Sequence, residues 1–465
     1  AFDKLWRYNQ HYFDDLTAQD ACSRNAWHQS LMDHWITHNP PGKGTGWEPY
    51  PTSLRIVNWI KWALAGNELS DRATQSLAVQ ARWVRQRLEW HLLGNHLFAN
   101  AKALVFAGLF FEGPEAEEWQ AKGLRILSKE TAEQILPDGG QFELSPMYHA
   151  LALEDVLDLI NVGRCYLGRL SPSAAHFHRG LADQVPSMRR WLSAMSHPDG
   201  RIAFFNDAAF GIAPTNEELD AYATRLGFAP IAQHDPQVWL EDSGYVRLSN
   251  SDAVLIADLA AVGPDYLPGH AHADTLSFEF SLFGRRLFVN SGTSVYGADE
   301  ERHRQRGTAA HNTVVVDGRN SSDVWSGFRV GRRARPYGRK VYHQDAALRA
   351  EASHDGYGRG PGRTEHRRCW QLSEDRLTVE DEVSGRATSA EARFHLHPDV
   401  IINLAGDDVA TVTLPGGRTA QLRARGGAIR LEEASWHPEF GAGLPSHCLV
   451  VPLRNGRSEL TVTWP

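Results

Sequence analysis

The spacing of the hydrophobic residues changes once along the chain, and this change constrains the fold more than any other feature. In the first half, apolar residues recur at helical spacing. One such stripe contains Leu77, Ala81, Val84, Leu88 and Leu92, and another contains Leu153, Val156, Leu157 and Ile160. Turn signals such as Pro137-Asp-Gly-Gly separate the stripes. The sequence therefore predicts a succession of helix hairpins over residues 16–226.

After about Asp235 the hydrophobic period becomes two. Leu276, Phe278, Phe280 and Leu282 alternate with polar residues, which predicts a hairpin with one buried face. Further short runs of this kind are separated by Gly-rich turns; they are Asn312 to Val316, Leu377 to Val383, Arg393 to His397, Ala410 to Leu414 and Leu460 to Trp464. Short strands at such spacing are typical of packed antiparallel sheets.

Helices followed by strands indicate an α+β multidomain protein rather than an alternating β-α-β chain. The chain has 465 residues, more than the roughly 250 to 300 at which a single core stops growing. We expect a helical domain over residues 1–235 and an antiparallel β domain over residues 236–465, with the boundary between residues 230 and 240.

The charge of the chain excludes some partners. The net charge is −8, whereas a nucleic-acid surface needs a basic face, so we expect no nucleic-acid partner. A bilayer-spanning helix needs about 20 apolar residues, and the sequence has no such run, so we expect no membrane insertion. The cations are mostly arginine, because only seven of the 48 basic residues are lysine. Guanidinium groups suit carboxylate and sulfate ligands, although a biased genome explains the same count.

The densest polar motif of the second half is His270-Ala-His-Ala-Asp274. In a strand, alternation would place His270, His272 and Asp274 on one face. A further histidine, His311, directly precedes an apolar strand. With 22 histidines in the chain, a lone histidine is more often structural, but a His-x-His-x-Asp arrangement is a stronger sign of a site.

Two motifs stand out in the helical half. They are Gly94-Asn-His-Leu-Phe-Ala-Asn100 and Asp138-Gly-Gly-Gln-Phe-Glu-Leu-Ser-Pro-Met-Tyr-His149. Their polar residues are also those that cap helices. Near the start, Trp47 and Tyr50 suit a surface that stacks on sugars and equally suit core packing.

Asn, Tyr and His side chains together suit the chemistry of a uronic acid. The proton beside the uronate carboxylate is barely acidic, because its removal places a second negative charge next to the first. An enzyme must neutralise the carboxylate, remove the proton with a base and protonate the departing glycosidic oxygen. An amide can do the first, and neutral His and Tyr can exchange the protons.

Together, Asn95-His-Leu-Phe, the Asp138 to Tyr148 segment, the His270 motif and Arg306 to Asp317 resemble the heparinase II/III family of polysaccharide lyases. The resemblance extends over almost the whole chain. It implies an incomplete (α/α) toroid followed by an antiparallel β-sandwich, and cleavage of an acidic polysaccharide by β-elimination. Many family-like proteins of exopolysaccharide loci have other substrates than heparin, so the resemblance implies a uronate-containing glycan, with sulfated glycosaminoglycan as one option.

Carried over to this chain, the resemblance implies roles for particular residues. Asn95 would neutralise the carboxylate. Tyr148 would be the acid, alone or also as the base, and His270 would be the partner base or a group that stabilises charge. The expected substrate contacts are His96, Glu143 and Arg306, with the aromatic residues Trp47 and Tyr50. Metal-containing members hold a structural zinc, and the corresponding residues here are His272, Asn290 and His311. Asn290 departs from the pattern, since an amide is a poor replacement for a carboxylate ligand of zinc.

Two other functions stay open at this point. A glycoside hydrolase would use Asp138 and Glu143 as paired carboxylates, but this leaves the histidines unexplained. A non-catalytic glycan-binding protein would use exposed aromatic residues such as Trp47, Tyr50, Trp59 and Trp325. The chain begins with Ala1 rather than Met, which agrees with a removed targeting segment, and we expect a periplasmic or secreted protein.

Overall fold

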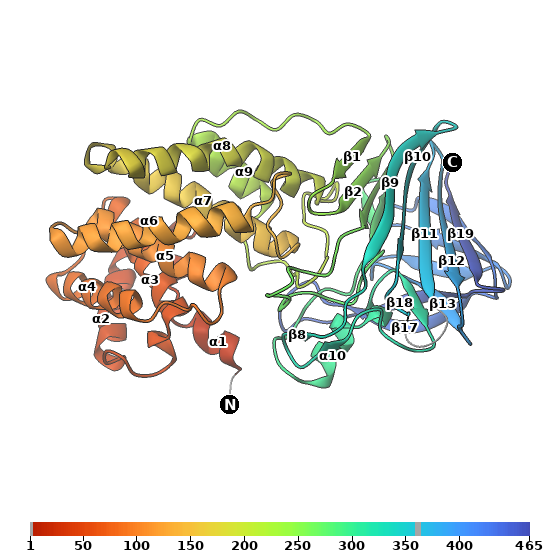
Figure 1. The fold of residues 1–465 in the computed structure, drawn as a ribbon, viewed down its shortest axis with the longest axis horizontal. Coiled ribbons are helices and arrows are strands. Elements are labelled where there is room, and N and C mark those ends of the chain that lie inside the picture. The colour runs from red at the N-terminus through yellow and green to blue at the C-terminus, as the bar shows by residue number, and fades with distance from the viewer. Residues whose placement is uncertain (1–2, 359–363) are drawn as a thin grey trace. The chain divides into compact units, whose positions relative to one another are not determined.

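The computed structural model describes residues 3–358 and 364–465, and its first half is helical. The helices before the first strand are α1 (Lys4–Asn9), α2 (Asn25–His38), α3 (Pro49–Leu64), α4 (Asp71–Gln86), α5 (Gly94–Phe110), α6 (Pro114–Gln134), α7 (Pro146–Cys165), α8 (Pro172–Ala194) and α9 (Asn216–Arg225). Figure 1 shows them in red to yellow-green.

The helical stripes of the sequence are confirmed with one change. Leu77, Ala81 and Val84 are buried on α4, whose N-terminus is capped by the Ser70 hydroxyl. However, α4 ends at Gln86, so Leu88 and Leu92 lie beyond it. The second stripe lies within α7, where Leu153, Val156, Leu157 and Ile160 are all buried.

The second half consists mainly of strands; its described residues also form the α-helix α10 (Glu300–Arg306) and a short 3-10 helix (Thr308–Ala310). The strands are β1 (Gln237–Leu240), β2 (Tyr245–Ser249), β3 (Ala253–Asp258), β4 (Phe278–Leu282), β5 (Arg285–Phe288), β6 (Val314–Val316), β7 (Val324–Trp325), β8 (Arg329–Val330), β9 (Pro336–Gln344), β10 (Ala347–His354), β11 (Glu365–Leu372), β12 (Arg376–Ser384), β13 (Ala390–His395), β14 (Ile401–Leu404), β15 (Val409–Thr413), β16 (Thr419–Arg425), β17 (Arg430–Trp436), β18 (Leu444–Pro452) and β19 (Arg457–Thr463). The predicted order of helices followed by antiparallel sheets is confirmed.

Within the described residues these strands form four sheets. One has five strands in the order β1-β2-β3-β4-β5, and a long one has the order β14-β15-β16-β19-β12-β11-β10-β9. The others are β17-β18-β13-β6 and the pair β7-β8. Figure 1 shows β9 to β12 side by side as long curved strands. A shared core lies between the sheets and includes Phe278, Phe288, Trp370 and Phe394.

The expectation of one buried face on the β4 hairpin is wrong. Residues on both faces of β4 are buried, including the polar Glu279 and Ser281. Their side chains bind the buried His197, whose Nε2 lies 2.8 Å from Glu279 and whose Nδ1 lies 2.7 Å from Ser281. The polar face of the strand thus has a hydrogen-bonding partner in place of water.

The chain forms two compact units that do not follow the order of the sequence. Unit 1 comprises residues 1–134 and 154–185, and unit 2 comprises residues 135–153 and 186–465. The helices α7 and α8 therefore contribute residues to both. In unit 2, α8 packs on β1 to β3 through an apolar cluster that includes Trp191, Ala194, Tyr245 and Ile256. Residues 135–153, which include the start of α7, thus share one unit with the β half, so the motifs of Tyr148 and His270 belong to the same unit.

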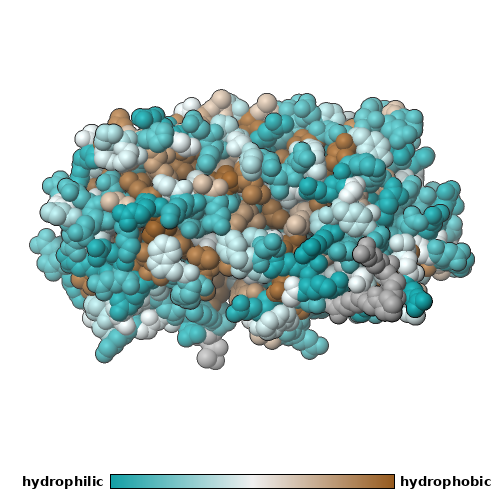
Figure 2. All heavy atoms as spheres, viewed as in Figure 1, coloured by the Kyte–Doolittle hydropathy of each residue, from teal (hydrophilic) through white to brown (hydrophobic). Residues whose placement is uncertain are grey.

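The face of the molecule in Figure 2 is covered largely by hydrophilic residues, with smaller hydrophobic areas between them. Among the described residues, no helix combines the length and the apolar character that crossing a membrane requires.

Candidate active site

A buried carboxylate, that of Asp207, lies at the centre of the polar cluster of unit 2. It follows Asn206, which has a left-handed φ of 57° and turns the chain sharply. The backbone holds this turn in place, because the Ser145 hydroxyl donates to the Asp207 carbonyl at 2.6 Å and the Asp207 N–H donates to the His270 carbonyl at 3.0 Å. The side chain of Asp207 is fully buried.

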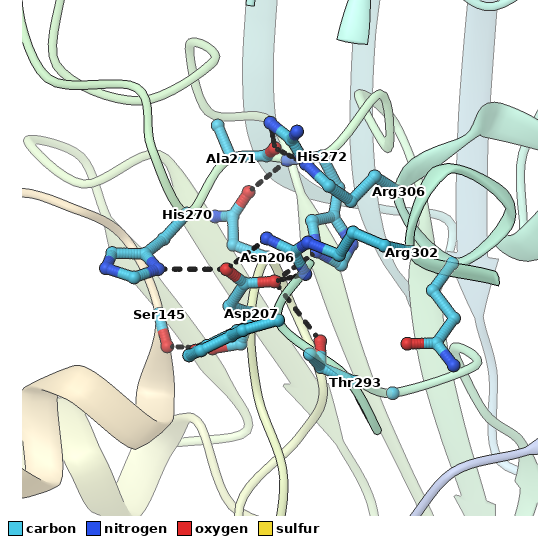
Figure 3. Close-up of polar contacts among 12 residues, drawn as sticks. Ser145, Asn206, Asp207, His270, Ala271, His272, Thr293, Arg302 and Arg306 are labelled. Atoms are coloured by element: carbon cyan, nitrogen blue, oxygen red, sulfur yellow. Dashed lines mark hydrogen bonds and ion pairs between the residues drawn. The ribbon is translucent and has the colours of Figure 1, made fainter. Parts of the chain in front are cut away.

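Two histidines of the predicted motif bind Asp207. His270 Nδ1 lies 2.9 Å from Oδ2, and His272 Nε2 lies 2.8 Å from Oδ1 (Figure 3). The predicted strand geometry is wrong, since residues 270–274 are irregular. The histidines converge because they reach different oxygens of one carboxylate. Asp274 does not join them: its carboxylate accepts a 3.3 Å hydrogen bond from the Asn206 N–H.

Arg302, from α10, balances the charge of Asp207. Its Nη2 donates to Oδ2 at 2.7 Å and its Nη1 contacts Oδ1, so the two groups form a bidentate pair. Burial alone would raise the pKa of Asp207, but the Arg302 charge and the hydrogen bonds from His270 and His272 hold it well below its usual value. Asp207 is therefore ionised throughout the physiological range.

The ionised Asp207 determines which nitrogen of His270 carries a proton. A carboxylate without a proton can only accept hydrogen bonds, so His270 Nδ1 must donate. The lone pair of neutral His270 is then on Nε2. The Glu143 carboxylate lies 3.6 Å from this nitrogen.

Tyr148 lies against His270. It belongs to the first turn of α7, where the Ser145 hydroxyl accepts its N–H at 3.2 Å. The centroids of the Tyr148 and His270 rings are 4.0 Å apart, and the Tyr148 hydroxyl is 2.9 Å from the hydroxyl of Tyr296. Burial, followed by the neighbouring Tyr296 and Asp207, raises the pKa of Tyr148 well above its usual value. The phenol thus stays protonated and can donate.

Sequence reasoning missed Asp207, Tyr296 and Arg302. An adjacent Asn-Asp pair inside the apolar stretch 202–210 is a signal for Asp207, because a buried acid needs a partner. Tyr296 and Arg302 lie in a loop and a short charged helix with no distinguishing pattern. Only the fold shows that Arg302 covers the Tyr296 ring, with 5.0 Å between guanidinium and centroid.

Four of the predicted residues lie in unit 1. Asn95 and His96 are partly exposed in the first turn of α5, and the His96 ring stacks on Tyr50 with a centroid distance of 4.4 Å. Trp47 corrects the prediction of a stacking surface. It is only 3% exposed, donates to the Asn39 carbonyl at 3.0 Å and packs among other tryptophans, so it is a core residue.

The position of Arg306 also differs from the predicted substrate contact. Its side chain is completely buried, and its guanidinium donates to the backbone carbonyls of Ala271, Ser326, Gly327 and Arg329. Figure 3 shows it beside Ala271. Arg306 therefore holds the His270 loop in place rather than facing a ligand.

The predicted zinc ligands lie together without forming a complete site. His272 Nδ1 and His311 Nε2 are 3.3 Å apart. Asn290, however, already accepts the Asn312 N–H at 3.1 Å and donates to the Phe204 carbonyl at 2.8 Å. The described residues contain no group of three or more His, Cys, Asp or Glu side chains arranged to hold a metal. A closed structural zinc site needs four ligands, so these residues do not fit one, and the metal stays a prediction.

Comparison with solved structures agrees with this architecture. A heparinase III crystal structure superimposes with a TM-score of 0.78 over 98% of this chain and 76% of that one, at 18% identity. This likeness concerns the fold.

Two curated relatives match parts of the sequence. A heparin-sulfate lyase of Bacteroides stercoris is 28% identical over 246 residues, which are 49% of this chain and 36% of the lyase. The matched part is thus well under half of the lyase's length. The FtsZ-localized protein C of Caulobacter vibrioides is 28% identical over 446 residues, 88% of this chain and 72% of that protein.

Two family models cover nearly all of the sequence. The heparinase II/III N-terminus model matches residues 17–225, and the heparinase II/III-like C-terminal model matches residues 232–465. The chain belongs to the heparinase II/III family.

Proposed function

We propose that this protein is a polysaccharide lyase that cleaves a uronate-containing acidic polysaccharide by β-elimination. The proposal depends above all on the pairing of His270 with Tyr148. An imidazole with a lone pair on Nε2 lies in ring contact with a protonated phenol, and both are held by buried groups of unit 2. A base beside an acid is the arrangement that elimination needs.

In the proposed reaction His270 is the base. Its Nε2 takes the proton from the carbon next to the uronate carboxylate. Asp207 keeps the ring in the required tautomer and, with Glu143, stabilises the imidazolium that forms. Since Arg302 neutralises Asp207, the buried carboxylate adds little repulsion toward an anionic substrate.

Tyr148 is the acid of the proposed reaction. Because its pKa is raised, the phenol rather than the phenolate is present at neutral pH, and it can protonate the departing glycosidic oxygen. The Tyr296 hydroxyl, 2.9 Å away, can then donate a hydrogen bond to the Tyr148 phenolate or return a proton to it. The bond between the sugar and its C4 oxygen breaks as a carbon–carbon double bond forms.

The proposed role of Asn95 is to neutralise the substrate carboxylate through its amide. It is partly exposed at the start of α5, and its side-chain amide has no hydrogen-bond partner among the described residues. The proposed sugar contacts there are His96, the next residue along the chain, and Tyr50, whose ring centroid lies 4.4 Å from that of His96. Zinc has no step in this proposal.

A hydrolase based on Asp138 and Glu143 is less well supported. Both oxygens of Asp138 are engaged: Oδ1 accepts the Gly140 N–H at 2.9 Å, and Oδ2 accepts the Ser243 N–H at 2.7 Å and its hydroxyl at 2.8 Å. A carboxylate with these bonds stabilises a turn and is poorly placed to protonate a leaving group.

A non-catalytic role is the second candidate, and one observation favours it. One of the two curated relatives described above, the one that matches 88% of this chain, is named for its localisation with FtsZ rather than for a reaction. If turnover had been lost, glycan binding alone would remain.

One experiment separates these functions. The protein is incubated with a panel of uronate polysaccharides, including heparan sulfate, and ultraviolet absorbance from an unsaturated product end is followed. Rising absorbance that disappears in Tyr148→Phe supports the lyase. New reducing ends without absorbance would indicate hydrolysis, and saturable binding without either would indicate the non-catalytic role. A polysaccharide substrate also agrees with the proposed periplasmic or secreted location.

A further inference from the structure

A cavity lies in unit 2, outside the candidate active site. It has a volume of about 550 Å³ and lies between α8, α9, the 230–234 segment and β2. Arg189, Ser193, His234, Arg247 and Ser249 are among its lining residues. None of the lining residues belongs to the Asp207 cluster. The volume is in the range of pockets for small molecules.

Arg247 is the unusual residue of this cavity. Its side chain leaves β2 on the face that packs against α8, and its Nη1 donates to the carbonyls of Ala194 at 3.2 Å and Ser196 at 2.7 Å. Nε is buried, and among the described residues neither Nε nor Nη2 has a hydrogen-bond partner. Buried polar groups are normally bonded, so this edge of the guanidinium lacks a partner.

The free edge is the one that this protein uses elsewhere to bind carboxylates. Arg82 donates through Nε and Nη2 to Glu115, at 2.8 and 2.7 Å. Arg286 does the same with Asp199, at 2.7 and 3.1 Å. These forks match the two oxygens of a carboxylate. Arg247 presents the same fork without an acid.

The charge of the cavity also favours an anion. Asp220, the one acidic residue among those that line it, is already bound by Arg189 Nε at 2.8 Å. Arg247 has no acidic partner in the described part of the chain. Burial lowers the pKa of Arg247 to about 10, so it stays cationic at neutral pH. His234 and Ser193, whose side chains are 2.9 Å apart, add polar groups to the wall.

We propose that this cavity binds a small sugar acid, with the Arg247 Nε and Nη2 groups donating to its carboxylate and the polar wall contacting its hydroxyls. The ligand is either a free uronic acid or the uronate end of a glycan chain. The inference is argued from Arg247 and its surroundings and does not depend on the proposed lyase activity.

Isothermal titration calorimetry of the full chain tests the proposal, with glucuronate as ligand and glucose as its neutral counterpart. We expect glucuronate to bind and glucose not to bind. Arg247→Gln should weaken glucuronate binding at least tenfold. Arg190→Gln is the matched control, because it removes an exposed arginine of the same region that does not line the cavity. It should leave binding unchanged.

Arg247→Gln also removes a hydrogen bond to the end of α8, so a second variant is needed in case it does not fold. Ala232→Trp fills the cavity from an exposed position away from α8, and it should abolish binding. A uronate trisaccharide that binds as tightly as glucuronate would indicate the end of a glycan chain, and weaker binding would indicate the free sugar acid. Binding of glucose equal to that of glucuronate, or glucuronate binding that survives both substitutions, would overturn the proposal.

Discussion

At the residue scale, the two tyrosines of the site should differ in importance. Tyr148→Phe removes the proposed acid while keeping the ring against His270, so kcat should fall by about 10²- to 10⁴-fold with little change in substrate binding. Tyr296→Phe removes one hydrogen bond to the acid and should reduce kcat only by roughly tenfold or less. Steady-state kinetics with a substrate found in the polysaccharide panel measures both. Equal losses would show that Tyr148 is not the proton donor.

Asp207 should matter for stability as well as for turnover. Asp207→Asn leaves Arg302 buried without a counter-charge, which typically costs about 3–5 kcal/mol of unfolding free energy. It also replaces one of the two acceptor oxygens by an NH2 group, so His270 Nδ1 and His272 Nε2 can no longer both donate to residue 207.

The matched control for Asp207→Asn is Asp265→Asn, which breaks an exposed ion pair with Arg333 of 3.0 Å. Exposed pairs contribute little, so urea unfolding should be unaffected. A similar unfolding curve for both variants would contradict the central position of Asp207.

At the element scale, the turn at Gly139 precedes the segment that carries Glu143 and Tyr148. Gly139 has a φ of +92°, and an added Cβ would lie 2.4 Å from the backbone of Ser187. Gly139→Ala should therefore lower the melting temperature through both backbone strain and a clash that neither partner can relieve.

Gly200 provides the comparison, since its φ of +78° is similar but no atom lies within 4 Å of an added Cβ. Gly200→Ala should show the strain alone, about 1 kcal/mol. If both variants melted at the same temperature, close packing against Ser187 would not be what holds the turn.

The elements also show which parts of the secondary structure can be predicted from the sequence. Period and turn signals were enough for α7 and for β12, where burial alternates along Arg376–Ser384. They fail at His270–Asp274, where the alternating pattern predicts a strand. The backbone there is held instead by hydrogen bonds to the side chains of Asn206 and Arg306. Alternation predicts a strand only where neighbouring strands accept its hydrogen bonds, and that is a tertiary property.

At the scale of the whole molecule, only part of the candidate site could be predicted, again because its geometry depends on tertiary structure. Tyr148 and His270 are far apart in sequence but belong to one unit, and their ring contact agrees with the predicted pairing. Asn95 belongs to unit 1, and its proposed role stays a prediction. Asp207 was not predicted, because a buried acid can be recognised only by the residues that surround it in the fold.

Buried histidines should make the stability of the whole protein depend on pH. Burial lowers the pKa of His149 and His395 to about 3 and that of His178 to about 4, from an ordinary value of 6.5. Below pH 6.5 the unfolded chain therefore binds protons that the folded protein does not. Stability from these groups is fully present above that pH and is lost as the pH falls toward 3 to 4.

Each such histidine should lower the unfolding free energy by about 1.4 kcal/mol per pH unit within this window. Urea unfolding from about pH 7.5 to about pH 5 measures the slope. His178→Gln should reduce it by one histidine's share, because the glutamine binds no proton in either state. His343→Gln, at an exposed position of β9, is the control and should leave the slope as it is. Identical slopes in all three proteins would mean that His178 is protonated to the same extent in the folded and unfolded states, and that its burial does not limit stability in acid.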